Sequence, residues 1–219
     1  MSVKSRQRVT DYGEVFTSER EVNAMLDLVK QETERIESRF LEPACGNGNF
    51  LIEILRRKLS ILEARYKKDR LKFERYCVIA VGAIYGVELL EDNVEDCRLR
   101  LFECFNAQYT LLFKEEATEE FRETIRHILQ RNILWGDALT LQTVGEKEEA
   151  IVFSEWSLAE DGEKIKRCDY SMKRLLDRQS QENLELFSHL GQGVLVPKPV
   201  EEFPLVHYLE LRRLESDRE

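Results

Sequence analysis

The chain has 219 residues, with 33 Lys and Arg against 42 Asp and Glu, so its formal net charge is −9. This length is sufficient for one α/β domain with a substantial core. The acidic balance argues against an autonomous DNA-binding surface, because clustered Lys and Arg supply most of the affinity for duplex phosphates. No apolar stretch is long enough for a membrane span and the N-terminus lacks a signal-peptide core, so we expect a cytoplasmic protein.

The five cysteines form no C-x-x-C pair, which is typical of reduced thiols. The three histidines are isolated from one another along the chain. The sequence therefore predicts neither a metal site nor a nucleophilic system that depends on histidine.

A capping box opens the first well-defined helix, because Ser18 is followed three residues later by Glu21. We expect this helix to run to about Glu37. A short apolar strand then leads into Gly46 and Gly48, and residues 50–59 are apolar at helical spacing. Glycine adopts φ > 0 without penalty, so a ligand can approach the main chain of this turn and the N-terminus of the helix behind it.

Residues 84–89 predict a second buried strand, which ends in an acid and precedes a helix that begins near Glu91. A long helical region follows to about Arg131, with a break near residues 114–118 and Thr118 as a cap. A third strand is expected within residues 132–139.

Two β-prone runs flank Asp161 and Gly162 and predict a β-hairpin. Three late prolines indicate an extended C-terminal arm, whose apolar residues dock either on this domain or on a partner. We therefore divide the chain into residues 1–145, the main domain; residues 146–178, the hairpin with a helix; and residues 179–219, the arm. The apolar arm residues are Phe203, Leu205, Val206, Tyr208 and Leu209.

The run Glu42-Pro43-Ala44-Cys45-Gly46-Asn47-Gly48-Asn49-Phe50 resembles motif I of the S-adenosylmethionine-dependent amino-group DNA methyltransferases, whose pattern is Asp/Glu-Pro-x-Cys/Ala-Gly-x-Gly-x-Phe. Residues 13–18, Gly-Glu-Val-Phe-Thr-Ser, resemble motif X, which precedes motif I in the γ class of N6-adenine-specific enzymes from restriction-modification systems. Residues 132–139 resemble motif III. The resemblance implies an α/β, Rossmann-like class I methyltransferase fold with the hairpin and the arm appended.

The same resemblance implies roles for individual residues. Glu88, at the tip of the second strand, is expected to accept the ribose hydroxyls of S-adenosylmethionine. Asp137 is expected to hydrogen-bond the exocyclic amine of the cofactor's adenine. The predicted cofactor-binding residues are Phe16, Thr17, Glu42, Pro43, Ala44, Cys45, Gly46, Asn49, Phe50, Glu88, Leu89, Asp137 and Ala138.

The family's catalytic motif IV, Asn-Pro-Pro-Tyr/Phe, is absent, because the sequence contains no Pro-Pro dipeptide. In family members this motif accepts both hydrogens of the target amine and stacks on the flipped base. Two interpretations stay open. Either a partner polypeptide supplies the catalytic strand, or residues 154–156 occupy its place, with Glu155 accepting a proton and Trp156 stacking on a base.

The expected function is thus the S-adenosylmethionine-binding part of an N6-adenine DNA methyltransferase. A partner subunit would supply the catalytic strand and the target recognition domain, and would bring the chain to DNA. One alternative is a catalytically silent cofactor-binding or interaction subunit of a restriction-modification or phage-defence system. The other is a methyltransferase that acts on a non-DNA substrate through Glu155.

Overall fold

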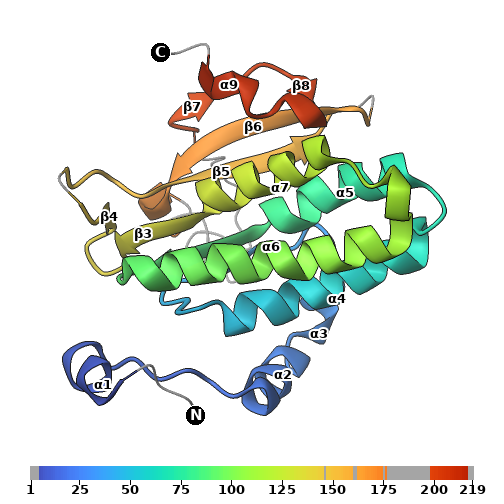
Figure 1. The fold of residues 1–219 in the computed structure, drawn as a ribbon. Helices are drawn as coiled ribbons and strands as arrows, with labels where there is room; N and C mark the ends of the chain where they lie inside the picture. Colours follow the sequence, from blue (N-terminus) through green and yellow to red (C-terminus); the bar gives the residue numbers. More distant parts are fainter. Residues whose placement is uncertain (1–4, 146, 160–161, 175, 177–197, 217–219) are drawn as a thin grey trace, which may run out of the picture.

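Figure 1 shows the computed structural model, which describes residues 5–145, 147–159, 162–174, 176 and 198–216. The helices are α1 (Arg6–Tyr12), α2 (Glu19–Asp27), α3 (Lys30–Thr33), α4 (Asn49–Tyr66), α5 (Arg70–Gly82), α6 (Glu91–Phe113), α7 (Glu119–Asn132) and α9 (Arg213–Ser216), with 3-10 turns η1 (Lys114–Glu116) and η2 (Tyr208–Glu210). The strands are β1 (Phe40–Glu42), β2 (Ile84–Glu88), β3 (Ile133–Asp137), β4 (Gln142–Thr143), β5 (Val152–Leu158), β6 (Lys164–Ser171), β7 (Glu201–Glu202) and β8 (Val206–His207).

The first sheet has the strand order β1-β2-β3-β4. Strands β1, β2 and β3 are parallel, with Glu42 opposite Gly86 and Glu88 opposite Trp135, and the short β4 is antiparallel to β3. Because parallel strands end at the same edge of a sheet, the loops after β1, β2 and β3 lie together. The chain is therefore a mixed α/β protein built on a parallel sheet, as the sequence predicts.

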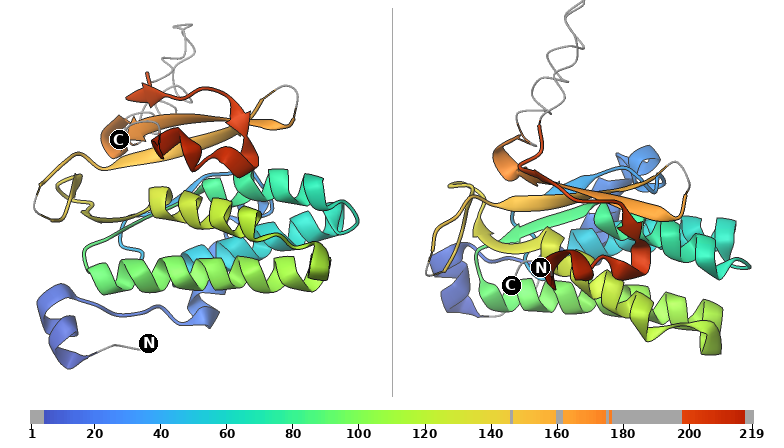
Figure 2. Two further views of the ribbon diagram at one scale, coloured as in Figure 1. Left: turned by 45° about the horizontal axis from the view of Figure 1, so that its top comes forward. Right: turned by 90° about the horizontal axis from the view of Figure 1, so that it is seen from above.

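Helices α4, α5, α6 and α7 run side by side against this sheet (Figures 1 and 2). The contact with α4 is close at Gly86, where a Cβ would lie 2.9 Å from Cys45 Sγ and 3.0 Å from Leu51 Cδ1. The opposite face of the sheet carries a smaller apolar cluster, in which Tyr85 meets the ring of Phe153 from β5 edge-on. The main core thus lies between the parallel sheet and its helices.

The capping box at the start of α2 is confirmed, since Ser18 Oγ accepts from Glu21 N and Glu21 Oε2 accepts from Ser18 N. The helix does not continue to Glu37, however; α2 ends at Asp27 and only the short α3 follows. The carbonyls of Ile36 and Ser38 instead accept hydrogen bonds from Lys58 Nζ, at 2.8 and 2.6 Å. A buried lysine on α4 therefore holds this segment in a non-helical path toward β1.

The helical region after β2 agrees with the sequence. Helices α6 and α7 are separated by η1, and Thr118 Oγ1 caps α7 by accepting from Phe121 N at 3.3 Å. No helix within the described ranges is long and apolar enough to cross a bilayer.

The predicted hairpin is present as β5 and β6, which pair from Val152↔Ser171 to Leu158↔Ile165. The second sheet is completed by β7 and β8, both antiparallel to β6.

The part of the predicted arm that the structure describes, residues 198–216, is therefore packed on this domain and is not an extended arm. Phe203 and Tyr208 are buried there, because Phe203 lies over Arg167 and Tyr208 Oη donates to Glu74 Oε2 at 2.6 Å. Residues 179–197 of that prediction lie outside the described residues.

Candidate functional site

A pocket of about 510 Å³ lies at the carboxyl ends of β1, β2 and β3. Four segments that are distant in the sequence contribute its lining. These are the residues before α2, the turn after β1, the end of β2 with the start of α6, and the end of β3. The lining residues are Gly13, Glu14, Val15, Phe16, Pro43, Ala44, Gly46, Glu88, Leu89, Leu90, Asn93, Gly136, Asp137, Ala138 and Leu139.

The two glycines of the turn after β1 have different roles. Both have positive φ, 51° at Gly46 and 89° at Gly48, as the sequence predicts. Gly46 lines the pocket, and a Cβ there would lie 3.2 Å from Cε1 of Phe16. Gly48 faces α6 instead, where a Cβ would lie 2.6 Å from Cys97 Sγ. Only Gly46 thus gives a ligand access to the main chain, whereas Gly48 allows α4 and α6 to pack.

Glu88 is held rigidly at the end of β2. Its Oε2 accepts from Gly46 N at 2.9 Å, and its Oε1 accepts from Leu90 N at 3.1 Å. Asn93 Nδ2 also donates to Oε1, at 3.5 Å, so Oε1 has two donors. A carboxylate oxygen accepts about two hydrogen bonds, so Oε2 retains a lone pair for a ligand hydroxyl. The main chain therefore orients the carboxylate in the pocket wall before any ligand arrives.

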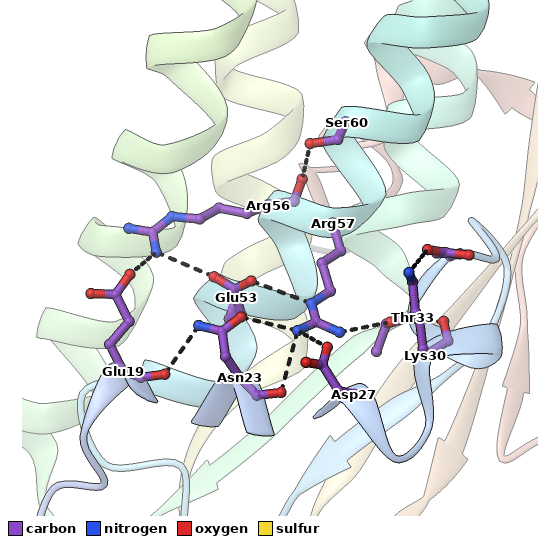
Figure 3. Close-up of polar contacts among 10 residues, drawn as sticks. Glu19, Asn23, Asp27, Lys30, Thr33, Glu53, Arg56, Arg57 and Ser60 are labelled. Carbon is purple, nitrogen blue, oxygen red and sulfur yellow. Dashed lines mark hydrogen bonds and ion pairs between the residues drawn. The ribbon is translucent and has the colours of Figure 1, made fainter. Parts of the chain in front are cut away.

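The segment before α2 is fixed over the pocket from two sides. Asn49 Nδ2 donates to Thr17 O at 2.9 Å, and Arg100 in turn donates to Asn49 Oδ1 at 3.0 Å. Behind it, Arg57 of α4 donates to Asn23 Oδ1 at 3.0 Å and forms further polar contacts with α2 and α3 (Figure 3). These bonds anchor α2 on α4, and they hold the preceding residues 13–16 against the pocket.

Apolar side chains surround the mouth of the pocket. Val15, Leu89 and Leu139 all line it and are nevertheless exposed, the first two to 44 % and Leu139 to 95 %. Exposed apolar residues beside a pocket offer surface to a flat, weakly polar ring. Asp137 lies next to them, with its Oδ1 accepting from Leu139 N at 2.8 Å, so one carboxylate oxygen shapes the turn.

The structure brings most of the predicted cofactor-binding residues to this pocket. Phe16, Pro43, Ala44, Gly46, Glu88, Leu89, Asp137 and Ala138 line it. Thr17, Glu42, Cys45, Asn49 and Phe50 are not among the lining residues. Asn49 and Thr17 are bonded to each other as described above, and Phe50 packs against the main core.

Cys45 is buried and Glu42 is partly buried, and neither lines the pocket. A hydrogen bond with Cys97 and burial raise the pKa of the Cys45 thiol well above its ordinary value. Burial also raises the pKa of the Glu42 carboxyl. Cys45 is therefore a neutral core thiol at neutral pH.

Sequence reasoning missed two polar residues in the lining, Glu14 and Asn93. Glu14 belongs to the run that resembles motif X, but nothing in its spacing marks it as a pocket residue. Asn93 is two residues into α6, where a polar residue is unremarkable. Only the fold brings the two side chains together, with Asn93 Nδ2 donating to Glu14 Oε1 at 2.6 Å.

Glu155 and Trp156, the candidate catalytic residues, lie away from this pocket. Glu155 forms an ion pair of 2.5 Å with Arg39, which precedes β1. Trp156 packs against Gly82, which precedes β2. Both therefore lie at the amino ends of the parallel strands, where they line a separate cavity of about 450 Å³.

The chain is thus an α/β protein with an acidic, glycine-lined pocket at the carboxyl edge of a parallel sheet, which is the edge where open α/β sheets bind their ligands. Residues 16–150 match the family model described as the DNA-methyltransferase domain of MmeI. This match spans more than half of the chain, so the chain belongs to that family of restriction-modification methyltransferase domains. No curated protein and no solved structure gives a significant match.

Proposed function

We propose that the chain binds S-adenosylmethionine in the pocket at the carboxyl ends of β1–β3, within a Rossmann-like class I methyltransferase fold. The observation that carries this proposal is the convergence of four predicted segments on one cavity. The lining fits an adenosyl group, because it combines fixed carboxylates, a main-chain approach at Gly46 and apolar walls.

When bound, this cofactor supplies an electrophilic methyl group on a sulfonium centre. Glu88 would orient it by accepting ribose hydroxyls, and Asp137 would accept from the adenine amine with its remaining lone pairs. Residues 13–16 would cover the pocket opposite the motif I turn. The chain's contribution is to hold and orient the methyl donor for attack by an incoming amine.

We propose further that the methyl acceptor is the N6 amine of adenine in DNA, and that a partner polypeptide completes the enzyme. Three observations support the need for a partner. The sequence lacks the Asn-Pro-Pro-Tyr motif, and its net charge is −9. Among the described strands, β1 pairs with β2 alone, so its other edge is open to an added strand beside the motif I turn.

Calorimetry with S-adenosylmethionine tests the binding step. Wild-type protein is expected to bind, and Glu88→Gln is expected to weaken binding by about 1.5–3 kcal/mol, the range for a hydrogen bond to a charged group. Glu155→Gln is the matched control, because it removes a carboxylate from the other end of the sheet and should leave the affinity unchanged. A folded wild-type protein that shows no binding would refute the proposed function.

Transfer of labelled methyl groups to mixed genomic DNA at low salt tests the need for a partner. The chain alone is expected to give no transfer, whereas addition of a polypeptide that carries an Asn-Pro-Pro-Tyr strand should restore it. Transfer by the chain alone would contradict the split-enzyme proposal, and loss of that transfer in Glu155→Ala would point to the Glu155 mechanism. Cofactor binding without transfer under either condition would favour the silent subunit.

A further inference from the structure

Two residues that line the pocket each have a buried acceptor atom without a hydrogen-bond partner in the structure: Glu14 Oε2 and Asn93 Oδ1. The side chain of Glu14 is only 6 % exposed, and Asn93 is completely buried. Leaving such an atom without a donor costs about 1–3 kcal/mol, and more when the group is charged. Buried acceptors of this kind are rare in folded proteins, and a bound ligand is one way to satisfy them.

The bonds around Glu14 show that its structural role uses one oxygen only. Arg8 Nη2 and Asn93 Nδ2 both donate to Oε1, at 2.8 and 2.6 Å. Arg8 in turn binds Asp92 through both terminal nitrogens, at 2.7 and 3.0 Å, which ties α1 to the start of α6. The anchoring of α1 is thus complete without Oε2.

The orientation of the Asn93 amide is dictated by its neighbours. Its Nδ2 lies 2.6 Å from Glu14 Oε1 and 3.5 Å from Glu88 Oε1. An ionised carboxylate only accepts hydrogen bonds, so the nitrogen must face both acids and the amide oxygen must face away. Asn93 therefore links the two carboxylates and leaves its own oxygen as a further acceptor.

We propose that Glu14 is a second ribose-binding carboxylate, which accepts one hydroxyl of the cofactor's ribose while Glu88 accepts the other. This inference rests on the proposed binding of S-adenosylmethionine and assigns a residue to its ribose. Two acids bridged by one amide favour a ligand with two neighbouring hydroxyl donors, which is the chemistry of a ribose cis-diol. The site would consequently discriminate against a sugar that lacks either hydroxyl, because a buried acceptor would then stay unpaired.

The test compares S-adenosylhomocysteine with its 2′-deoxy and 3′-deoxy analogues by calorimetry, on wild-type protein and on Glu14→Gln. In the wild type, removal of each hydroxyl is expected to weaken binding about tenfold or more. Glu14→Gln is expected to weaken binding of the parent ligand by a similar factor. In Glu14→Gln, removal of the hydroxyl that Glu14 binds should reduce the affinity much less than it does in the wild type, because the acceptor of that hydroxyl is already altered.

Asp92→Asn is the matched control, since it loosens the same Arg8 anchor without altering a residue of the pocket lining. It is expected to leave both the affinity and the hydroxyl discrimination close to those of the wild type.

Equal weakening of the binding of all three ligands by Glu14→Gln would overturn the proposal and make Glu14 an anchor for α1 only. Unchanged affinity in Glu14→Gln together with weaker binding by Glu88→Gln would also overturn it, while leaving the proposed function intact. A wild type that binds none of these ligands would refute both.

Discussion

Buried carboxylates occur both beside the pocket of the first sheet and inside the second sheet, but their bonding differs. In the second sheet, Asp169 Oδ1 accepts from Arg167 Nε and Ser154 Oγ, each at 2.8 Å. Its Oδ2 accepts from Arg167 Nη2 at 2.8 Å and from Arg131 Nη2 at 3.2 Å. Both oxygens of Asp169 are therefore satisfied by the protein itself.

Glu14 beside the pocket shows the opposite arrangement, because both of its donors bind one oxygen and the other has none. A network in which every acceptor has a protein donor, such as that of Asp169, holds elements together and leaves no acceptor for a ligand. A network with an unsatisfied buried acceptor, such as that of Glu14, is destabilised by the desolvation of that acceptor, and a ligand that donates a hydrogen bond to it removes this penalty. The comparison teaches that burial alone does not indicate function; the distribution of donors over each buried group does.

The largest effect is expected at the closed network. Asp169→Asn should lower the free energy of unfolding by about 3–5 kcal/mol, because Arg167, 2 % exposed, would lose its buried counter-charge. Urea unfolding followed by circular dichroism measures this loss. Glu202→Gln, which removes the exposed Lys166–Glu202 pair from the same sheet, should cost far less. Similar losses in the two variants would contradict the assignment of Asp169 as a structural carboxylate.

Substitutions at Gly48 and Gly46 are expected to have different effects, the first on packing and the second on ligand binding. Gly48→Val should destabilise the fold, by about 1–3 kcal/mol from the positive φ alone and by more from the overlap with Cys97. Gly46→Val shares the backbone penalty, but its side chain enters the pocket and should abolish binding of S-adenosylmethionine. Thermal unfolding and calorimetry on both variants give the measurement. Normal binding by Gly46→Val would show that this turn is structural only.

Lys58 provides the one pH-dependent effect among these predictions, because it is a buried amine whose described hydrogen bonds are to carbonyls alone. Burial lowers the pKa of Lys58 from 10.5 to about 7. Between these values the unfolded chain holds a proton that the folded chain has released, so stability rises with pH. The rise is at most about 1.4 kcal/mol per pH unit for this group.

Unfolding free energies from pH 7 to pH 10 check this prediction, with Lys58→Met as the comparison. The difference in stability between the two proteins should change with pH, and the variant should lack the contribution of Lys58. Parallel pH profiles would show that Lys58 titrates normally in the folded protein.

The sequence by itself determined the local features of the chain. The Ser18–Glu21 capping box, the Thr118 cap, the β5–β6 hairpin and the positive φ of Gly46 and Gly48 all match the structure. Each depends on residues within a few positions of one another, so spacing and residue type are sufficient to specify it. The parallel order of β1, β2 and β3 also agrees with the predicted succession of strands and helices.

The tertiary structure alone decided which of these residues face the pocket. Gly46 and Gly48 have the same predicted role in the sequence, yet Gly48 packs against α6 and Gly46 lines the pocket. Glu14 and Asn93 are 79 positions apart and meet only because α1 folds back onto the start of α6. Tertiary contacts also set the path of the chain into β1, where the carbonyls of Ile36 and Ser38 accept from Lys58. They likewise place Glu155 at the amino ends of the parallel strands, beside Arg39. Contacts of this kind follow from the register of strands and the packing of helices, which no local spacing encodes.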